Sequence, residues 1–354
     1  MERELARRKF IKTLGVAAGV ATAASLAPRS SAQQKEKEMA TETAGNPMIW
    51  ANLLHLSYNM WGDREPLESE GRSPYWAAKP YLRFDDTLWN DLLKKMAGVG
   101  MNMVVIDVGD GVHYESHPEI SVKNAWSHDR TREELAKARA LGLEPIPKLN
   151  FSACHDEWLG PYARCLSTET YYKVCRDVIT EVIDLFDKPR FFHLGMDEET
   201  ARHQRLQQYA VLRQYDLWWH DFNLLVEAVE KGGSRAWIWS DYVWDHPEAF
   251  FEKMPKSVLQ SNWYYGLEFG PDAKYVQAYH QLEEHGYDQI PTGSNWSTPE
   301  NFEKTVPYCS TLIGPARLKG FLQAPWKPTL EECREHHMQA VEQVGRAIAK
   351  FAAT

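Results

Sequence analysis

The stretch Arg190-Phe-Phe-His-Leu-Gly-Met-Asp-Glu-Glu199 runs from four apolar or aromatic residues, 191–194, through a glycine into three consecutive carboxylates. This pattern predicts a buried strand that stops abruptly and presents its acids at its C-terminal end. Parallel α/β folds place their catalytic groups at that end of their strands. The alternative is a structural turn, in which Gly195 reverses the chain and Asp197 or Glu198 caps the next helix.

Seven further apolar runs of strand length flank this stretch, and helix-like segments separate them. The eight runs lie at residues 48–56, 101–108, 143–151, 191–194, 236–239, 258–265, 289–296 and 318–324. This alternation predicts an α/β fold of the (β/α)8 TIM-barrel type, as a single domain over residues 47–354. A doubly wound open sheet is the other fold considered, but the glycine-rich phosphate turn typical of it is absent after the first run.

Several intervening helices carry sequence signals for their first turn. A capping box, in which Ser or Thr is followed three residues later by Glu, occurs at Thr131-x-x-Glu134, Ser297-x-x-Glu300 and Thr329-x-x-Glu332. Each box predicts that a helix begins there. Another helix is expected from about Thr168.

The N-terminal segment is predicted to be an export signal rather than part of the fold. Arg7 and Arg8 precede a weakly hydrophobic run at 14–27, and Ser30-Ser-Ala32 offers small residues for cleavage. This order indicates a twin-arginine signal peptide at 1–32, with a run too short and too rich in alanine for a membrane span. Residues 33–46 lack apolar periodicity and predict a flexible linker. The mature protein is therefore expected to be periplasmic or secreted.

The composition excludes some partners. The chain of 354 residues carries a formal charge of −9, and loss of residues 1–32 removes six Lys/Arg and two Asp/Glu, which leaves about −13. Such a charge disfavours nucleic acid and anionic membranes as partners. The 14 Trp suit a site that stacks on flat ligands such as sugar rings. The five Cys are odd in number and have no metal-like spacing, so they are interpreted as structural.

The pattern His193-x-Gly195-x-Asp197-Glu198 resembles the His-x-Gly-Gly-Asp-Glu signature of family 20 glycoside hydrolases, the β-N-acetylhexosaminidases. The similarity extends over most of the predicted barrel. It includes residues 101–105, the segment 132–150 with a histidine shortly after it, 258–264 and 318–326.

The chain also departs from that family. No Arg stands at the end of the first run, which reads His55-Leu-Ser-Tyr58, whereas the family grips the sugar's outer hydroxyls there with an Arg. Asn150 replaces the acid of the third strand, Met196 replaces a Gly, and Lys327 follows the last tryptophan of the eighth strand. The resemblance therefore implies that the catalytic end is retained and that the grip on the terminal sugar is rebuilt.

The resemblance implies substrate-assisted hydrolysis, in which the 2-acetamido oxygen of the sugar is the nucleophile. Asp197 would orient the acetamide and Glu198 would be the general acid and then base. An ionised Asp197 is expected to raise the pKa of Glu198 and keep it protonated near neutrality. No cofactor or metal is implied. The residues expected to contact the carbohydrate are Tyr58, Asn150, His155, Trp239, Asp241, Trp263, Tyr264 and Trp326.

Within this set, Tyr264 is expected to donate to the acetamide oxygen, and the three tryptophans are expected to wall the sugar. Asp241 has the alternative role of a helix cap. The barrel reading further predicts that a set of side chains rings one mouth of the barrel. That set is Asp107, Asn150, Glu198, Asp241, Tyr264, Asn295 and Trp326.

Two other functions remain open. A metal-dependent isomerase or hydrolase barrel would draw its ligands from Asp107, His113, His117, His155, Asp197 and Asp241. His113 and His117 run directly into Pro118, which disfavours a helical pair of ligands. A carbohydrate-binding barrel without catalysis is the second alternative, and the intact pair of Asp197 and Glu198 argues against it.

Overall fold

The structure is a computed structural model that describes residues 47–270 and 272–353. The predicted signal peptide and linker lie outside these residues. Within them, eight parallel strands form one sheet in the order β6-β5-β4-β3-β2-β1-β8-β7. The strands are β1 (Ile49–His55), β2 (Met103–Asp107), β3 (Glu144–Lys148), β4 (Phe191–His193), β5 (Arg235–Trp239), β6 (Leu259–Ser261), β7 (Thr292–Gly293) and β8 (Gly320–Gln323).

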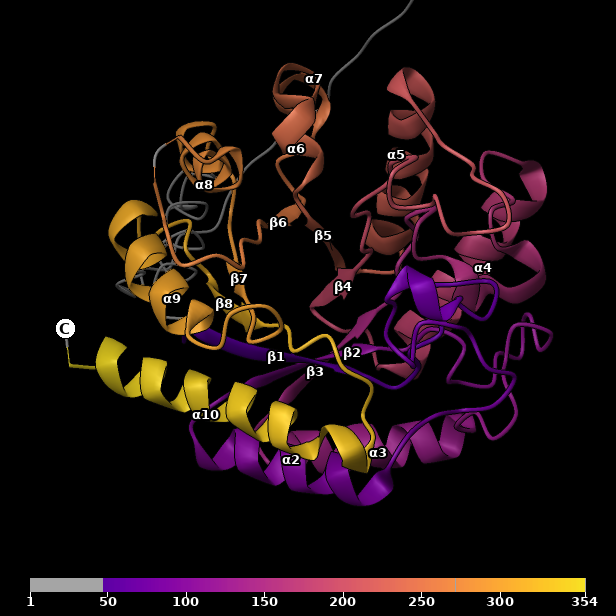
Figure 1. Cartoon of the computed structure of the whole chain (residues 1–354), viewed down its shortest axis with the longest axis horizontal. Coiled ribbons are helices and arrows are strands. Elements are labelled where there is room, and N and C mark those ends of the chain that lie inside the picture. Colours follow the sequence, from indigo (N-terminus) through magenta and orange to yellow (C-terminus); the bar gives the residue numbers. More distant parts are fainter. Residues whose placement is uncertain (1–46, 271, 354) are drawn as a thin grey trace, which may run out of the picture. The chain divides into compact units, whose positions relative to one another are not determined.

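The sheet nearly closes, because parallel bridges join Gln260 to Gln289 and Trp263 to Thr292 across its two edges. Helices lie on the outer side of the strands (Figure 1). They are α2 (Asp86–Gly98), α3 (His128–Ala140), α4 (Glu169–Leu185), α5 (Tyr215–Lys231), α6 (Tyr242–Asp245), α7 (Pro247–Lys253), α8 (Lys274–Glu284), α9 (Asn301–Leu312) and α10 (Arg334–Phe351), with 3-10 turns at Glu68–Glu70, Glu157–Tyr162 and Glu331–Cys333. This confirms the (β/α)8 barrel.

The strands are apolar on both faces because each face is covered. In β1, Ala51 and Leu53 pack into the barrel interior, whereas Trp50 and Leu54 pack against the surrounding helices. Alternation of this kind explains why the runs are nearly continuous in apolar residues, as expected of parallel strands buried on both sides.

The helix starts agree with the sequence signals in one case and differ in three. Thr168 caps α4 by accepting a hydrogen bond from the Tyr171 amide, as expected. By contrast, α3 begins at His128 with Ser127 as its cap, α9 begins at Asn301 without a side-chain cap, and α10 begins at Arg334. The predicted starts at the three capping boxes are therefore wrong.

The capping boxes fail because their hydroxyls have other partners. The Thr131 hydroxyl donates to the Ser127 carbonyl inside the first turn of α3. The Thr329 hydroxyl donates to the His55 carbonyl at the end of β1 and ties the start of the last helical segment to the barrel. A tertiary or upstream partner thus replaces the local cap.

A charged layer lies inside the barrel beneath the ends of the strands. Lys148 is fully buried, and its Nζ lies 2.5 Å from Oδ2 of Asp107. His55 Nδ1 lies 3.4 Å from the same oxygen. Burial alone would raise the pKa of Asp107, but the charge of Lys148 and the hydrogen bond from His55 outweigh it and lower this pKa. The layer therefore holds an ionised Asp107 against a buried Lys148.

All five cysteines are free, and four of them are buried. Across the described residues, none of the helices is both long and apolar enough to span a bilayer.

Candidate active site

The acids are presented by a tight turn directly after β4. Gly195, Met196 and Glu198 all have positive φ values, 70°, 74° and 57°. A Cβ on Gly195 would lie 2.1 Å from Oδ1 of Asn150, so only glycine fits there. Backbone in this region costs energy for a residue with a side chain, and such strain concentrates at functional sites. Neighbouring strands hold the turn, since Asn150 Oδ1 accepts from the Met196 amide and the Trp239 amide donates to the Gly195 carbonyl.

Asp197 is 5% exposed, and both of its oxygens have a protein neighbour. Oδ1 accepts a 2.7 Å hydrogen bond from Nδ2 of Asn150. Oδ2 lies 3.5 Å from Nε2 of His155. Asn150 is itself buried and acts on Asp197 rather than lining a cavity. Asn150 therefore fixes the Asp197 carboxylate, and its contact with substrate stays a prediction.

Glu198 is the more open of the two acids, with 27% of its side chain exposed. Its Oε2 lies 3.4 Å from Nε2 of His155, and its Oε1 lies 3.4 Å from Nε2 of His203. Burial pushes the pKa of Glu198 upward, but the hydrogen bond and charge of His155, with the charges of His203 and Arg72, outweigh burial and lower this pKa. The expectation that Asp197 raises it is therefore wrong, because two imidazoles dominate the local field.

His155 carries the complementary shift. Burial opposes its protonation, but the charges of Asp197 and Glu198 outweigh burial and raise the pKa of this imidazole. The two opposite shifts favour a protonated His155 beside an ionised Glu198.

Asp241, two residues after the end of β5, is the third acid at this point. Its Oδ2 accepts a 2.8 Å hydrogen bond from the Glu198 amide, while its Oδ1 is enclosed without a partner. It makes no side-chain cap for α6, so the capping role is not realised. Burial, followed by the charge of Asp197, raises the pKa of Asp241 well above its usual range. Its environment therefore disfavours ionisation, and Asp241 holds the turn through the Glu198 amide.

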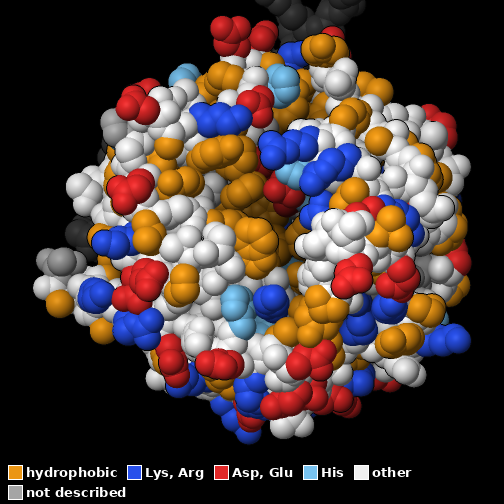
Figure 2. Space-filling view, in the orientation of Figure 1, with side chains coloured by type: hydrophobic (Ala, Val, Ile, Leu, Met, Phe, Trp, Pro, Cys, Tyr) orange, Lys and Arg blue, Asp and Glu red, His pale blue; other side chains and the backbone are white. Residues whose placement is uncertain are grey.

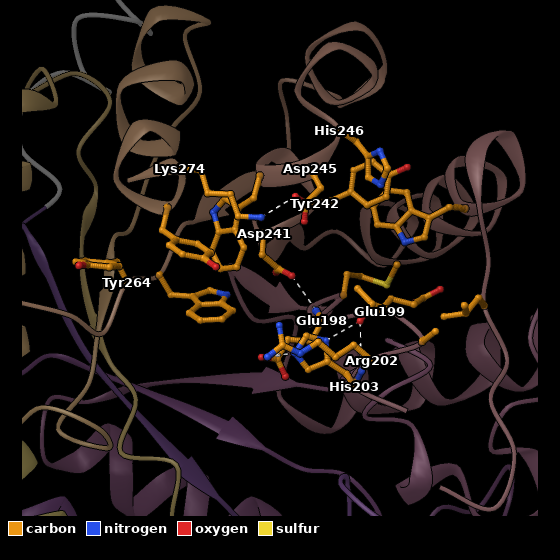
Figure 3. A pocket seen from close by; sticks show the side chains of 18 of the residues that line it. Glu198, Glu199, Arg202, His203, Asp241, Tyr242, Asp245, His246, Tyr264 and Lys274 are labelled. Carbon is orange, nitrogen blue, oxygen red and sulfur yellow. Dashed lines mark hydrogen bonds and ion pairs between the residues drawn. The ribbon is translucent and has the colours of Figure 1, made fainter. Parts of the chain in front are cut away.

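Two cavities meet at Glu198. The smaller, of 310 Å³, also contains Asp197. Its remaining lining residues are largely aromatic and comprise Tyr58, Trp61, Gly71, Arg72, Ser73, Trp76, Trp263, Tyr265, Trp296 and Trp326. The larger, of 900 Å³, extends over the loops after β4, β5 and β6 (Figure 3). Figure 2 shows the opening as a hollow with hydrophobic side chains inside and Lys or Arg side chains beside it.

The predicted aromatic residues differ in where the structure places them. Trp263, Trp326 and Tyr58 line the smaller cavity, and the Tyr58 hydroxyl donates to the Trp326 carbonyl. Trp239 lines neither cavity. It is 1% exposed, and its ring lies 4.4 Å from His193 and 5.8 Å from Trp326, so it packs behind the wall.

Tyr265, and not Tyr264, faces the acids. Trp326 Nε1 donates to the Tyr265 hydroxyl at 2.8 Å, and the charges of Asp197 and Glu198 add to burial in raising the pKa of Tyr265. Tyr264 lines only the larger cavity, where its hydroxyl donates to the Glu268 carbonyl away from the acids (Figure 3). The sequence did carry a signal for Tyr265. Side chains two residues apart on an extended segment point to the same face, so Tyr265 is expected to face the same way as Trp263.

The predicted ring of residues is only partly assembled. Glu198 and Trp326 share one cavity, so both lie at the same end of the barrel as expected. The side chain of Asn295 instead donates to the His336 carbonyl, and the Asp107 carboxylate is paired with Lys148. Sequence reasoning missed Trp61, Arg72 and His203, which come from loops without periodicity.

The predicted metal ligands do not assemble as a set. His117 is held by Glu119 and Asp177, and Asp107 by Lys148. Within the described residues, one group of three side chains has ligand atoms within 4.8 Å of one another, and it consists of His155, Asp197 and Glu198. Any metal would therefore compete directly with the His155–Glu198 contact.

No family model matches the chain. A β-hexosaminidase of Emericella nidulans is 23% identical over 231 residues, which are 52% of this chain and 36% of that protein. The chain thus corresponds to little more than a third of this relative's length.

Solved structures share the fold. The β-N-acetylhexosaminidase of Bacteroides fragilis has a TM-score of 0.57 at 14% identity, over 86% of this chain and 70% of that one. An exo-β-N-acetylglucosaminidase of family GH20 from Vibrio harveyi, solved with N-acetylglucosamine, has a TM-score of 0.58 at 13% identity, over 84% and 54%. A Streptomyces plicatus β-hexosaminidase in complex with its product gives 0.58 at 13%, over 84% and 64%.

Proposed function

We propose that the protein is a retaining glycoside hydrolase that removes β-linked N-acetylhexosamine by substrate-assisted catalysis. The observation that carries this proposal is the pair of Asp197 and Glu198, held by one strained turn at the end of β4 beside an aromatic cavity. The likeness in fold to β-N-acetylhexosaminidases and the weak sequence similarity to one of them support it.

The smaller cavity suits one sugar ring, since Trp263 and Trp326 offer apolar faces and Asp197 lies beside them. Asp197 accepts from the acetamide N–H and holds the acetamide oxygen against the anomeric carbon. That oxygen forms a bond to the carbon as the bond to the leaving oxygen breaks. A tethered nucleophile reaches effective molarities of about 10⁵–10⁸ M, so no protein nucleophile is required.

Asp241 is poorly suited to be a protein nucleophile. A neutral carboxyl attacks weakly, and Asp241 has a raised pKa and an oxygen engaged by the Glu198 amide. This favours the acetamide of the substrate as the nucleophile over a covalent intermediate on the enzyme.

Glu198 donates a proton to the leaving oxygen and then takes one from the water that opens the cyclised intermediate. The raised pKa of His155, 3.4 Å away, favours this imidazole as the holder of the proton before substrate binds, so the two groups act as one acid. Replacing His155 with Gln should move the alkaline limb of kcat/KM to lower pH, because a lone carboxyl loses its proton earlier than the pair. An unchanged limb would show that Glu198 titrates independently of His155.

The function is tested with aryl β-glycosides that differ only in the 2-substituent. Hydrolysis is expected for the 2-acetamido sugar, with the 2-hydroxyl sugar slower by orders of magnitude, because it lacks the internal nucleophile. Equal rates for both, or hydrolysis of the 2-hydroxyl sugar alone, would refute the substrate-assisted mechanism. Binding of the 2-acetamido sugar without turnover would instead favour the non-catalytic barrel.

A metal-dependent hydrolase is the second candidate, because ligand atoms of His155, Asp197 and Glu198 lie within 4.8 Å of one another. Metal analysis of the purified protein, with rates before and after chelation, separates the two. Stoichiometric metal together with loss of activity on chelation would favour this candidate.

We further propose export by the twin-arginine route, on the basis of Arg7, Arg8 and the apolar run that follows. The double substitution Arg7→Lys and Arg8→Lys should keep the protein in the cytoplasm. Unchanged levels in the periplasm or medium, measured by fractionation, would indicate another route.

A further inference from the structure

Three arginines lie at or beside the two cavities of the site. Arg72, Arg202 and Arg205 are exposed, and among the described residues none of them forms an ion pair with a carboxylate. The chain carries a net charge of −9, so an unpaired basic group at the active-site opening runs against its average charge. Figure 2 shows basic side chains gathered beside the hollow.

The three side chains come from two loops that the barrel brings together. Arg72 belongs to the segment between β1 and α2 and lines the smaller cavity, with its guanidinium 5.9 Å from the Trp76 ring. Arg202 follows the acids in sequence and lines the larger cavity. Arg205 Nη1 donates to the Arg202 carbonyl at 2.8 Å. Burial and the charge of Arg205 lower the pKa of Arg72, and the charges of Glu198 and Glu70 oppose this shift without outweighing it.

The charge of Glu198 acts on Arg72 without forming an ion pair, and the other carboxylates nearby are engaged by different basic groups. Glu70 is bound by Arg64, with Nη2 2.6 Å from Oε1. Glu199 is bound by the buried Arg213 at 2.6 Å. Asp245, on the far side of the larger cavity, is bound by Lys274 at 2.6 Å. The guanidinium donors of Arg72 and Arg202 therefore line the two cavities without an ion pair to any described residue and are available to a ligand.

We propose that the substrate carries a sulfate ester or a carboxylate next to the cleaved linkage, and that Arg72, Arg202 and Arg205 bind this anionic group. Guanidinium groups suit such ligands, because their planar N–H donors match the oxygens of carboxylates and sulfate-like anions. The inference rests on the proposed glycosidase function and specifies its substrate class as anionic glycans.

The two cavities distinguish where the anion lies. Arg72 lines the cavity that contains Asp197, so it would bind a group on the sugar that is cleaved off. Arg202 lines the larger cavity, so it would bind a group on the neighbouring sugar.

Tryptophan fluorescence of the full chain tests the inference, because several tryptophans line the smaller cavity. The probes are N-acetylglucosamine, its 6-sulfate, and a disaccharide of N-acetylglucosamine linked to glucuronate. At least one anionic probe is expected to bind about tenfold more tightly than the neutral sugar, and added salt should reduce the difference. In the triple variant Arg72→Gln, Arg202→Gln, Arg205→Gln, the ratio of the affinities for the anionic and the neutral probe should fall close to one.

Single variants assign the anion. If Arg72→Gln weakens binding of the 6-sulfate alone, the anionic group lies on the cleaved sugar. If Arg202→Gln weakens binding of the disaccharide alone, the anionic group lies on the neighbouring sugar. Arg346→Gln, which removes an exposed arginine paired with Glu303, is the matched control and should keep the wild-type ratio.

Equal affinities for neutral and anionic probes in the wild type, or equal losses for both in the triple variant, would overturn the inference. Binding does not depend on turnover, so the two proposals fail separately. Hydrolysis of the neutral aryl 2-acetamido glycoside without any preference for anionic probes would refute the anionic-substrate inference and leave the glycosidase proposal standing. Anion preference without hydrolysis would remove the proposed glycosidase function and keep the basic site.

Discussion

Replacing Glu198 with Gln should lower kcat/KM by about 10²–10⁴ on substrates with a poor leaving group, the usual contribution of a general acid. The loss should be small for formation of the intermediate when the leaving group is an acidic phenol, which departs without a proton. Rates across a series of aryl 2-acetamido glycosides measure this dependence. Glu284→Gln, an exposed change at the end of α8, is the matched control and should leave the series unchanged.

Asp197→Ala provides the contrasting pattern. Asp197 is expected to hold the acetamide in its attacking pose, which every leaving group requires, so good and poor leaving groups should be slowed alike. Circular dichroism checks that the turn and barrel survive the loss of the Asn150 contact. The same dependence on leaving group in both variants would mean that these roles are assigned wrongly.

Replacing Lys148 with Met should lower the free energy of unfolding by about 3–5 kcal/mol, because it leaves Asp107 ionised and buried without its main partner. His55, 3.4 Å from the same oxygen, compensates only partly, since burial lowers its own pKa. Urea unfolding of variant and wild type measures the loss.

Two comparisons show whether the loss arises from a stranded charge. The double variant Lys148→Met with Asp107→Leu removes both charges and should recover much of the stability, because apolar pairs replace buried ion pairs at little cost. Lys231→Met breaks an exposed pair with Glu227 and should cost at most about 1 kcal/mol. A double variant as unstable as Lys148→Met alone would show that packing of the lysine stem, and not its charge, stabilises the barrel interior.

The sequence by itself determined the barrel and the place of its acids. Each of the eight apolar runs coincides with a strand to within one residue or contains it, because strands buried on both faces must be apolar along their length. Gly195 and the two acids after it lie where the run predicted, since a strand end and a tight turn are encoded within a few neighbouring residues. Local signals were less reliable at helix starts, where Thr329 bonds to His55 across the fold instead of capping α10.

Only the tertiary structure decided which side chains face the acids and in what charge state. Trp239 and Tyr264 resemble site residues in sequence, but the first packs behind Trp326 and the second points away from the acids. The pKa of Glu198 depends on His155 and His203, which come from different loops, so its sign cannot be read from the adjacent Asp197. Periodicity encodes the elements, whereas electrostatic shifts depend on distances between residues far apart in the chain, and folding sets those distances.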